Sequence, residues 1–220
     1  PPGTITYGQT TDVDLSNATT RHIIQWGGLN LLANETLNFN STQANFYVLN
    51  HVNAAGGATQ INGILNAVGG QGHIFIVNQA GVLFGQTAVV NAASFHAAAA
   101  NVTDQFQNDF LAGGPLTFST TEGAVEFHGT LNATESVSLI GKLVENSGSI
   151  TGQSIVMAVG HSVVIDQLDD RIMVQIDGID MDDTFEPSPA VGHAVTDTVG
   201  LLNSGNITVP VGGDVTLAVG

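Results

Sequence analysis

The chain has 220 residues, enough to bury a sizeable core as one domain, and its 19 acidic and 3 basic side chains give a formal net charge of −16. This charge would repel a polyanion, which excludes nucleic acid and an anionic membrane surface as partners. The absence of cysteine excludes a disulfide scaffold, a thiolate metal site and cysteine catalysis. No apolar run is long enough to predict a membrane span.

Short alternating segments of four to six residues, bounded by Gly or Asn, predict β-strands along the chain. In chain order they cover residues 4–7, 23–26, 45–49, 73–77, 137–140, 155–159, 162–165 and 214–219. Two further segments leave helix and strand open. Residues 92–100 are rich in Ala, and residues 103–111 place Asp104 in a first turn and Phe106 and Phe110 four residues apart.

Four segments share the pattern Gly-x-(Ile/Leu)-(Asn/Thr) and begin at Gly63, Gly129, Gly148 and Gly205. The second and third are 19 positions apart, and the third and fourth are 57 apart, which is three times 19 and predicts that the phase holds between them. Such a period, with two or three short strands per unit, is typical of a β-solenoid whose stacked coils share an apolar interior. A β-sandwich with accidental similarity is the alternative.

Residues 36–103 contain no Asp, Glu, Lys or Arg. In a parallel solenoid, like residues stack above like at a spacing of about 4.8 Å. A column of identical charges would repel at that spacing, whereas columns of Asn, Thr and Ser can form hydrogen bonds along the axis. The uncharged run is therefore a composition that a stack of coils tolerates.

The clearest charged feature is a group of eight acidic residues: Asp166, Asp169, Asp170, Asp177, Asp180, Asp182, Asp183 and Glu186. A calcium loop or a glycosidase carboxylate pair would use such residues, but EF-hand spacing is missing, and a solvated loop is favoured. The seven His are never three or four positions apart, so no local metal pair is predicted. His73 and His161 each follow a Gly, and we expect both at corners or edges.

An ordered string of motifs covers the first half of the chain. It runs through Leu49-Asn50-x-Val52, Ile61-x-Gly63-x-Leu65, Gly72, Asn78-Gln79-Ala80-Gly81-Val82-Leu83-Phe84-Gly85 and Val90-Asn91. Ile24-x-Trp26 and Phe39 precede it, and "VTDQFQNDFLAGGPLTF" follows it. Over residues 4–165 this string resembles the N-terminal secretion domain of filamentous-haemagglutinin-like exoproteins, which use two-partner secretion.

One departure falls in the signature tetrapeptide of that family, which is Asn-Pro-Asn-Gly. Here it reads Asn78-Gln79-Ala80-Gly81. The outer Asn and Gly, which a tight turn needs, are present, and we expect Gly81 to adopt a left-handed conformation. Without the Pro and the inner Asn, the turn is less preorganised.

The resemblance implies an all-β, right-handed parallel β-helix (a β-solenoid) with an N-terminal β cap and extra-helical β elements. We expect one secretion domain over residues 1–220, with the cap in 1–35 and an insertion in 166–200. It implies a monomeric, non-catalytic domain without cofactor or metal. The residues expected to form the turn and to be recognised by the transporter are Asn78, Gln79, Ala80, Gly81, Val82, Phe84, Gly85 and Asn91.

The implied partner is an outer-membrane barrel transporter with periplasmic domains. The domain would direct a large exoprotein, adhesin-like or haemagglutinin-like, through this barrel to the cell surface or the medium, and would nucleate β-helix folding there. The chain stops at "DVTLAVG" in mid-pattern, and a raw strand edge would promote aggregation, so we expect the natural protein to continue past Gly220.

Two other functions fit a β-solenoid. The first is a carbohydrate-active β-helix enzyme, although Arg21, Lys142 and Arg171 are a thin supply of charge for an acidic polysaccharide. Only residues 166–183 could offer the two carboxylates of a hydrolase. The second is a structural surface solenoid without a role in secretion.

Overall fold

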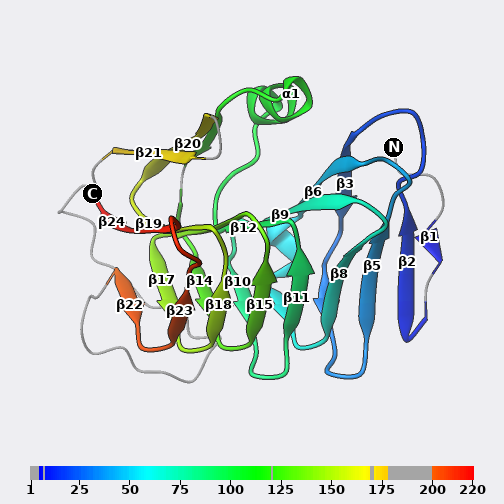
Figure 1. The fold of residues 1–220 in the computed structure, drawn as a ribbon, viewed down its shortest axis with the longest axis horizontal. Helices are drawn as coiled ribbons and strands as arrows, with labels where there is room; N and C mark the ends of the chain where they lie inside the picture. The colour runs from blue at the N-terminus through cyan, green and yellow to red at the C-terminus, as the bar shows by residue number, and fades with distance from the viewer. Residues whose placement is uncertain (1–4, 7, 120, 169–170, 178–199) are drawn as a thin grey trace.

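The computed structural model describes residues 5–6, 8–119, 121–168, 171–177 and 200–220. Within these residues the chain winds into a three-sided parallel β-helix, in which successive coils stack along one axis (Figure 1). Each complete coil adds one strand to each of three sheets, here called sheets 1, 2 and 3. The described residues include no helix of the length and apolarity that crossing a membrane requires.

Sheet 1 has eight strands among the described residues, and all its pairs are parallel except that of β1 with β2. In spatial order they are β1 (Ile5–Thr6), β2 (Thr10–Asp14), β5 (Thr36–Asn40), β8 (Ile64–Val68), β11 (Val89–Ala92), β15 (Thr130–Ala133), β18 (Ser149–Thr151) and β23 (Asn206–Thr208).

Sheets 2 and 3 are parallel throughout the part of the chain that the structure describes. Sheet 2 runs in the order β22 (Leu201–Asn203), β17 (Leu143–Asn146), β14 (Ala124–Phe127), β10 (Val82–Phe84), β7 (Thr59–Ile61) and β4 (Asn30–Leu31). Sheet 3 runs in the order β24 (Asp214–Val219), β19 (Ser154–Val159), β16 (Ser136–Gly141), β12 (Ser94–Ala98), β9 (Gln71–Val77), β6 (Asn45–Val52) and β3 (Arg21–Trp26). A short 3-10 helix, Ala54–Gly56, lies at the corner between β6 and β7.

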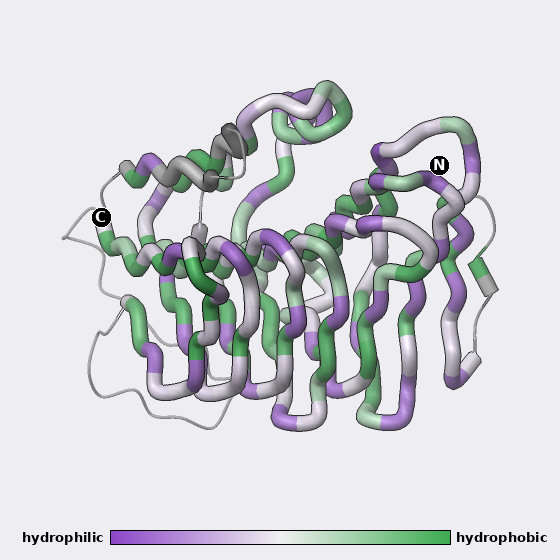
Figure 2. Tube along the Cα trace, in the orientation of Figure 1, coloured by the Kyte–Doolittle hydropathy of each residue, from purple (hydrophilic) through white to green (hydrophobic). Residues whose placement is uncertain are grey.

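The main core fills the inside of the β-helix with one apolar side chain from every second strand position. Leu65, Val90 and Leu131 point inward from sheet 1, and Phe84 and Phe127 point inward from sheet 2; all five are fully buried. Figure 2 shows hydrophobic and hydrophilic residues interleaved along the coils. The interior is therefore continuous from coil to coil, as the repeat predicts.

Two segments leave the coils at the same corner, between a strand of sheet 3 and the next strand of sheet 2. The first contains α1 (Asp104–Ala112) and β13 (Leu116–Ser119), and the second contains β20 (Ser162–Leu168) and β21 (Arg171–Asp177). Strands β13, β20 and β21 form an antiparallel sheet. Figure 1 shows α1 and this sheet on the same side of the β-helix.

These excursions create a second core on the outer face of sheet 3. Phe75 and Val156 point outward from the sheet and pack with Phe106, Phe110 and Val163, all of them buried. The central strands of sheet 3, from β9 to β19, are thus buried on both faces, which produces near-continuous apolar runs in them.

Seven of the eight predicted strands lie within strands, and the described part of the first, residues 5–6, is strand β1. The candidate segment 103–111 forms a helix from residue 104 onward. Thr103 caps α1, because its Oγ1 accepts a hydrogen bond from Phe106 N at 3.1 Å. Residues 92–100 are mainly extended rather than helical, with β12 at their centre. Pairing with β9 on one side and β16 on the other overrides the helix propensity of Ala.

The 19-residue spacing is confirmed, since Thr130 pairs directly with Ser149. The interpretation of the 57-residue interval as three coils is wrong. Ser149 pairs directly with Asn206, so the interval is one coil enlarged by β20, β21 and the residues that follow them. Residues 178–199 lie outside the described residues, and the limits of the cap (1–35) and of the insertion (166–200) stay predictions.

Candidate functional site

The turn Asn78–Gly81 follows β9 directly and leads into β10. Asn78 is fully buried, and its Nδ2 donates to Gly57 O at 2.9 Å and to Thr59 Oγ1 at 3.1 Å. Its Oδ1 accepts from Ala80 N at 3.0 Å, and its carbonyl accepts from Gly81 N at 2.9 Å. One side chain therefore closes the turn and ties it to the preceding coil.

The inner positions of the tetrapeptide are less constrained. Gln79 is half-buried, and its Nε2 donates to Glu122 Oε2 at 3.3 Å. Ala80 contributes its backbone N–H to the bond with Asn78. Gly81 has φ +115°, which confirms the predicted left-handed conformation, and a Cβ there would lie 3.0 Å from Ala124 O. The turn keeps its shape without the Pro and the inner Asn of the family signature because the outer residues carry the hydrogen bonds.

Strand β10 lies in the middle of sheet 2 and packs into the main core. Val82 and Phe84 are buried, and the Phe84 ring lies 5.2 Å from the ring of Phe127 and 5.5 Å from that of Phe95. Gly85 follows, where any Cβ would collide with the side chain of Asn62. The folded protein therefore encloses this part of the motif.

Asn91, in contrast to these interior residues, lies on the outer face of sheet 1. Its Nδ2 donates to Asn66 Oδ1 at 2.8 Å, and its Oδ1 accepts from Asn132 Nδ2 at 2.9 Å. These bonds belong to a row that we call the amide ladder, defined as Asp12, Asn38, Asn66, Asn91 and Asn132. Asn91 thus stands apart from the turn, and the structure does not gather the predicted recognition residues on one exposed patch.

Both edges of β10 are used in the folded state. Val82 pairs with Thr59 on one side and with Val125 on the other. Strand β11 is likewise paired with both β8 and β15. An edge-on contact with a partner strand would need these backbone groups, and they are available only before the coils stack.

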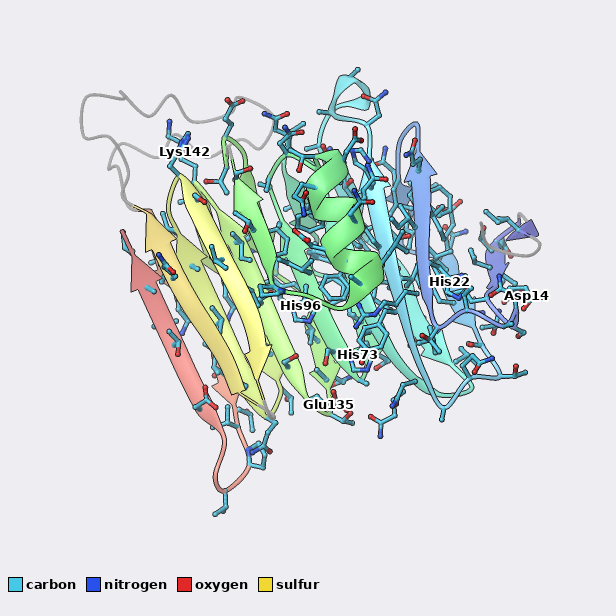
Figure 3. All side chains as sticks on the ribbon, turned by 90° about the horizontal axis from the view of Figure 1, so that it is seen from above. Asp14, His22, His73, His96, Glu135 and Lys142 are labelled. Atoms are coloured by element: carbon cyan, nitrogen blue, oxygen red, sulfur yellow. The ribbon has the colours of Figure 1, made fainter. Side chains whose placement is uncertain are left out.

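Two buried histidines, His73 and His96, lie beneath α1. His73, predicted at a corner or edge, instead lies inside β9 and is buried, with its ring stacked on Tyr47 at 4.1 Å; that prediction is wrong. His96 stacks on Phe75 at 4.3 Å, and its Nδ1 lies 2.7 Å from Ser138 Oγ. His161 is exposed just before β20, as expected. Figure 3 looks down on α1 and labels His73, His96 and Glu135.

Burial controls the charge of these two side chains. It lowers the pKa of His73 to about 4, with a smaller contribution from the Arg21 charge. It lowers the pKa of His96 to about 3, with a smaller contribution from His73. Both are neutral at pH 7. Sequence reasoning missed this cluster, although the unbroken apolar runs "HIFIV" and "AAAA" indicate strands buried on two faces.

The acidic stretch does not add a site to this description. Asp169, Asp170 and residues 178–199 lie outside the described residues, so the calcium and carboxylate-pair hypotheses stay predictions. Among the residues that are described, no group of His, Asp or Glu is arranged to hold a metal ion.

The structure is thus a β-solenoid domain: a parallel β-helix with an extra-helical helix and sheet, and with a tight turn built into its third coil. The sequence pattern of the TPS secretion domain family matches residues 4–214, and the chain belongs to this family. This is a non-catalytic family, so the chain is a secretion domain for two-partner secretion of an exoprotein and not an enzyme.

Solved structures agree with this assignment. The chain is similar to the HMW1 secretion domain from Haemophilus influenzae, with a TM-score of 0.69 and 25% sequence identity. The similarity covers 98% of this chain and 54% of that one, so this chain spans about half the length of its relative. No curated protein sequence matches the chain. Membership of the family implies a transporter partner and export by the two-partner route.

Proposed function

We propose that the transporter recognises residues 78–91 as unfolded chain, and that the segment is then withdrawn into the β-helix as it folds. The observation that carries this proposal is the double pairing of β10 and β11 in the folded state. An extended segment with free N–H and C=O groups can add to an exposed strand of a partner. Folding removes those groups, which releases the segment from the transporter and makes export directional.

The chemistry of the segment favours main-chain recognition. Residues 36–103 carry no Asp, Glu, Lys or Arg, so long-range charge adds little to its binding. Main-chain hydrogen bonds would provide affinity, while Val82, Phe84 and Asn91 would set the register. The turn residues Asn78 and Gly81 would limit how far the bound strand extends.

Secretion of paired variants tests this directly. Asn78→Ala and Phe84→Ser are expected to leave the protein in the periplasm. Asn146→Ala and Phe127→Ser are the matched controls, because Asn146 is an equally buried Asn with two side-chain hydrogen bonds and Phe127 packs against Phe84 in the neighbouring coil. The controls should disturb the fold as strongly and still cross the outer membrane. Equal periplasmic retention of all four would refute recognition at residues 78–91.

A binding experiment distinguishes recognition of the unfolded domain from recognition of the folded domain. Denatured domain, freshly diluted, should bind the isolated periplasmic part of the transporter, with little change between low and moderate salt. Refolded domain should not bind. Strong binding by the refolded domain, or retention caused only by neutralising the acidic residues of 166–186, would show that recognition is electrostatic or uses the folded surface.

We further propose that the partner is an outer-membrane barrel with periplasmic domains, and that the exoprotein reaches the medium or the cell surface through the periplasm. The support is the family assignment together with the resemblance to filamentous-haemagglutinin-like proteins. On the same support, residues 1–220 form a single monomeric domain whose stacked coils nucleate the folding of a larger, adhesin-like protein. Attaching the domain to an unrelated β-helix and measuring its secreted yield, with and without the domain, tests this.

A further inference from the structure

The amide ladder has one direction along its whole length. Each Nδ2 donates toward the N-terminal end of the β-helix: Asn132 to Asn91 at 2.9 Å, and Asn91 to Asn66 at 2.8 Å. The row continues from Asn66 to Asn38 at 3.0 Å and ends where Asn38 donates to Asp12 Oδ1 at 2.9 Å. The ladder therefore crosses five neighbouring strands, from β15 to β2.

Amides alone do not choose this direction. An Asn side chain carries a donor and an acceptor, so a row of Asn can run either way with the same number of bonds. An ionised carboxylate only accepts. Asn38 must turn its Nδ2 toward Asp12, which leaves its Oδ1 for Asn66, and the same choice passes along the row. Thr151, which pairs with Asn132 at the other end, has a hydroxyl that both donates and accepts and selects neither direction.

Asp12 is bound as an acceptor. Its Oδ1 accepts from Asn40 Nδ2 at 3.1 Å as well as from Asn38. The hydrogen bond from Asn38, and then that from Asn40, lower the pKa of Asp12, so the carboxyl stays ionised at neutral pH. Hydrogen bonds to a charged acceptor are stronger than those between neutral groups and polarise the bonds behind them.

We propose that Asp12 is the positioning residue that sets the direction of the amide ladder and thereby favours the register in which each coil joins the one before it, beginning with β5 on the N-terminal strand β2. Every Asn Oδ1 then faces the next coil as an acceptor, and the incoming Asn must donate to it. A slip of one residue would turn that Asn into the apolar interior and leave the acceptor unpaired. The inference concerns folding of the isolated chain and does not depend on how the transporter recognises residues 78–91.

Side-chain amide NMR signals of the purified domain test the inference. Asp12→Asn keeps the shape of the side chain but adds a donor, so it is expected to let the row run both ways. The signals of Asn132, four strands away from position 12, should shift or double. Asp14→Asn is the matched control: Asp14 lies in the same strand and accepts from Ser16 N at 2.8 Å, outside the ladder. It should leave Asn132 unchanged.

A break in the middle of the ladder makes the test independent of local damage. In an Asn66→Ala background, replacing Asp12 should no longer change the side-chain amide NMR signals of Asn132. Refolding from urea should be about fivefold slower for Asp12→Asn and unchanged for Asp14→Asn, because only Asp12→Asn replaces the charged acceptor that the incoming Asn38 donates to. The proposal is overturned by any of three results: NMR signals of Asn132 that are the same in wild type and Asp12→Asn, a shift of those signals that persists in the Asn66→Ala background, or equal refolding rates of Asp12→Asn and Asp14→Asn.

Discussion

Sheets 1 and 3 belong to the same β-helix and bury the same kind of inner face, yet their outer faces are opposite in character. On sheet 1, half-buried and exposed polar side chains form the amide ladder, and the described residues place no other element over it. On sheet 3, Phe75, Ile140 and Val156 are buried beneath α1 and the antiparallel sheet. Water competes for the bonds of the first face and is excluded from the second.

In both sheets the inward pattern specifies the coil, while the outward residues decide how much each sheet adds to stability. Exclusion of water makes every truncation on sheet 3 costly. A hydrogen bond that water can replace contributes little net free energy. We therefore expect the outer face of sheet 3 to govern stability and that of sheet 1 to govern register.

The largest effect is expected from Phe110→Ala, which removes the α1 side chain that packs edge-on against Phe75 at 5.4 Å. The free energy of unfolding should fall by about 3–5 kcal/mol, because a buried Phe leaves a cavity. Urea denaturation measures it. Leu111→Ala, at a side chain 51% exposed in the same helix, is the control and should change stability by less than about 0.5 kcal/mol. Equal losses would show that α1 does not depend on sheet 3.

The next largest effect is expected from acid, which should destabilise the packing on the outer face of sheet 3. The unfolded pKa of His is 6.5, and burial lowers it to about 4 for His73 and about 3 for His96. The unfolded chain binds these protons first, so the stabilisation is complete above pH 6.5 and is lost as the pH falls toward 4 and 3. His96→Asn should flatten the curve of stability against pH between pH 6.5 and 4, by an amount on the order of 3 kcal/mol over that window.

The control for this pH dependence is His161→Asn, because His161 is exposed. Carboxylates elsewhere titrate in both variants and cancel in the comparison. Glu135, whose Oε2 lies 3.7 Å from His73 Nδ1, and Arg21 remain in both variants as well. Parallel curves for wild type and His96→Asn would mean that His96 is accessible to water.

A smaller effect is expected at Arg21, which joins the β-helix to the end of α1. Its guanidinium lies 3.9 Å from the centre of the Tyr47 ring, and its Nη1 donates to Phe110 O at 2.9 Å. Arg21→Met keeps the aliphatic stem and should cost about 1–2 kcal/mol in urea denaturation. Arg21→Lys should recover only part of this loss, since an ammonium group does not stack as a planar guanidinium does. Full recovery of stability by Arg21→Lys would show that Arg21 stabilises the protein through its charge alone.

The smallest effect is expected on the outer face of sheet 1. Asn91→Ala removes two links of the amide ladder where water can replace them, and should cost about 0.5–1.5 kcal/mol. Thermal unfolding is sensitive enough to detect it. Thr130→Ala, an exposed position in the adjacent strand of the same sheet, is the reference and should be close to neutral. A loss at Asn91 as large as that at Phe110 would contradict the proposed difference between the faces.

Local pattern was sufficient for much of this fold. Strand positions and the positive φ of Gly81 each depend on a few neighbouring residues, and each is confirmed. The columns of Asn expected from the uncharged run are present as the amide ladder. The recognition role of residues 78–91 stays a proposal, because it concerns a partner and an unfolded state.

By itself the sequence determined that the chain forms stacked parallel coils, because inward apolar residues and corner Gly recur at short spacing. Only the tertiary structure decided which coils are neighbours across the excursions, as the pairing of Ser149 with Asn206 shows. It also decided that β12 is a strand and that His73 and His96 are buried and neutral. The physical reason is the same in each case: these features depend on contacts between segments far apart in the chain, whose burial outweighs local propensity.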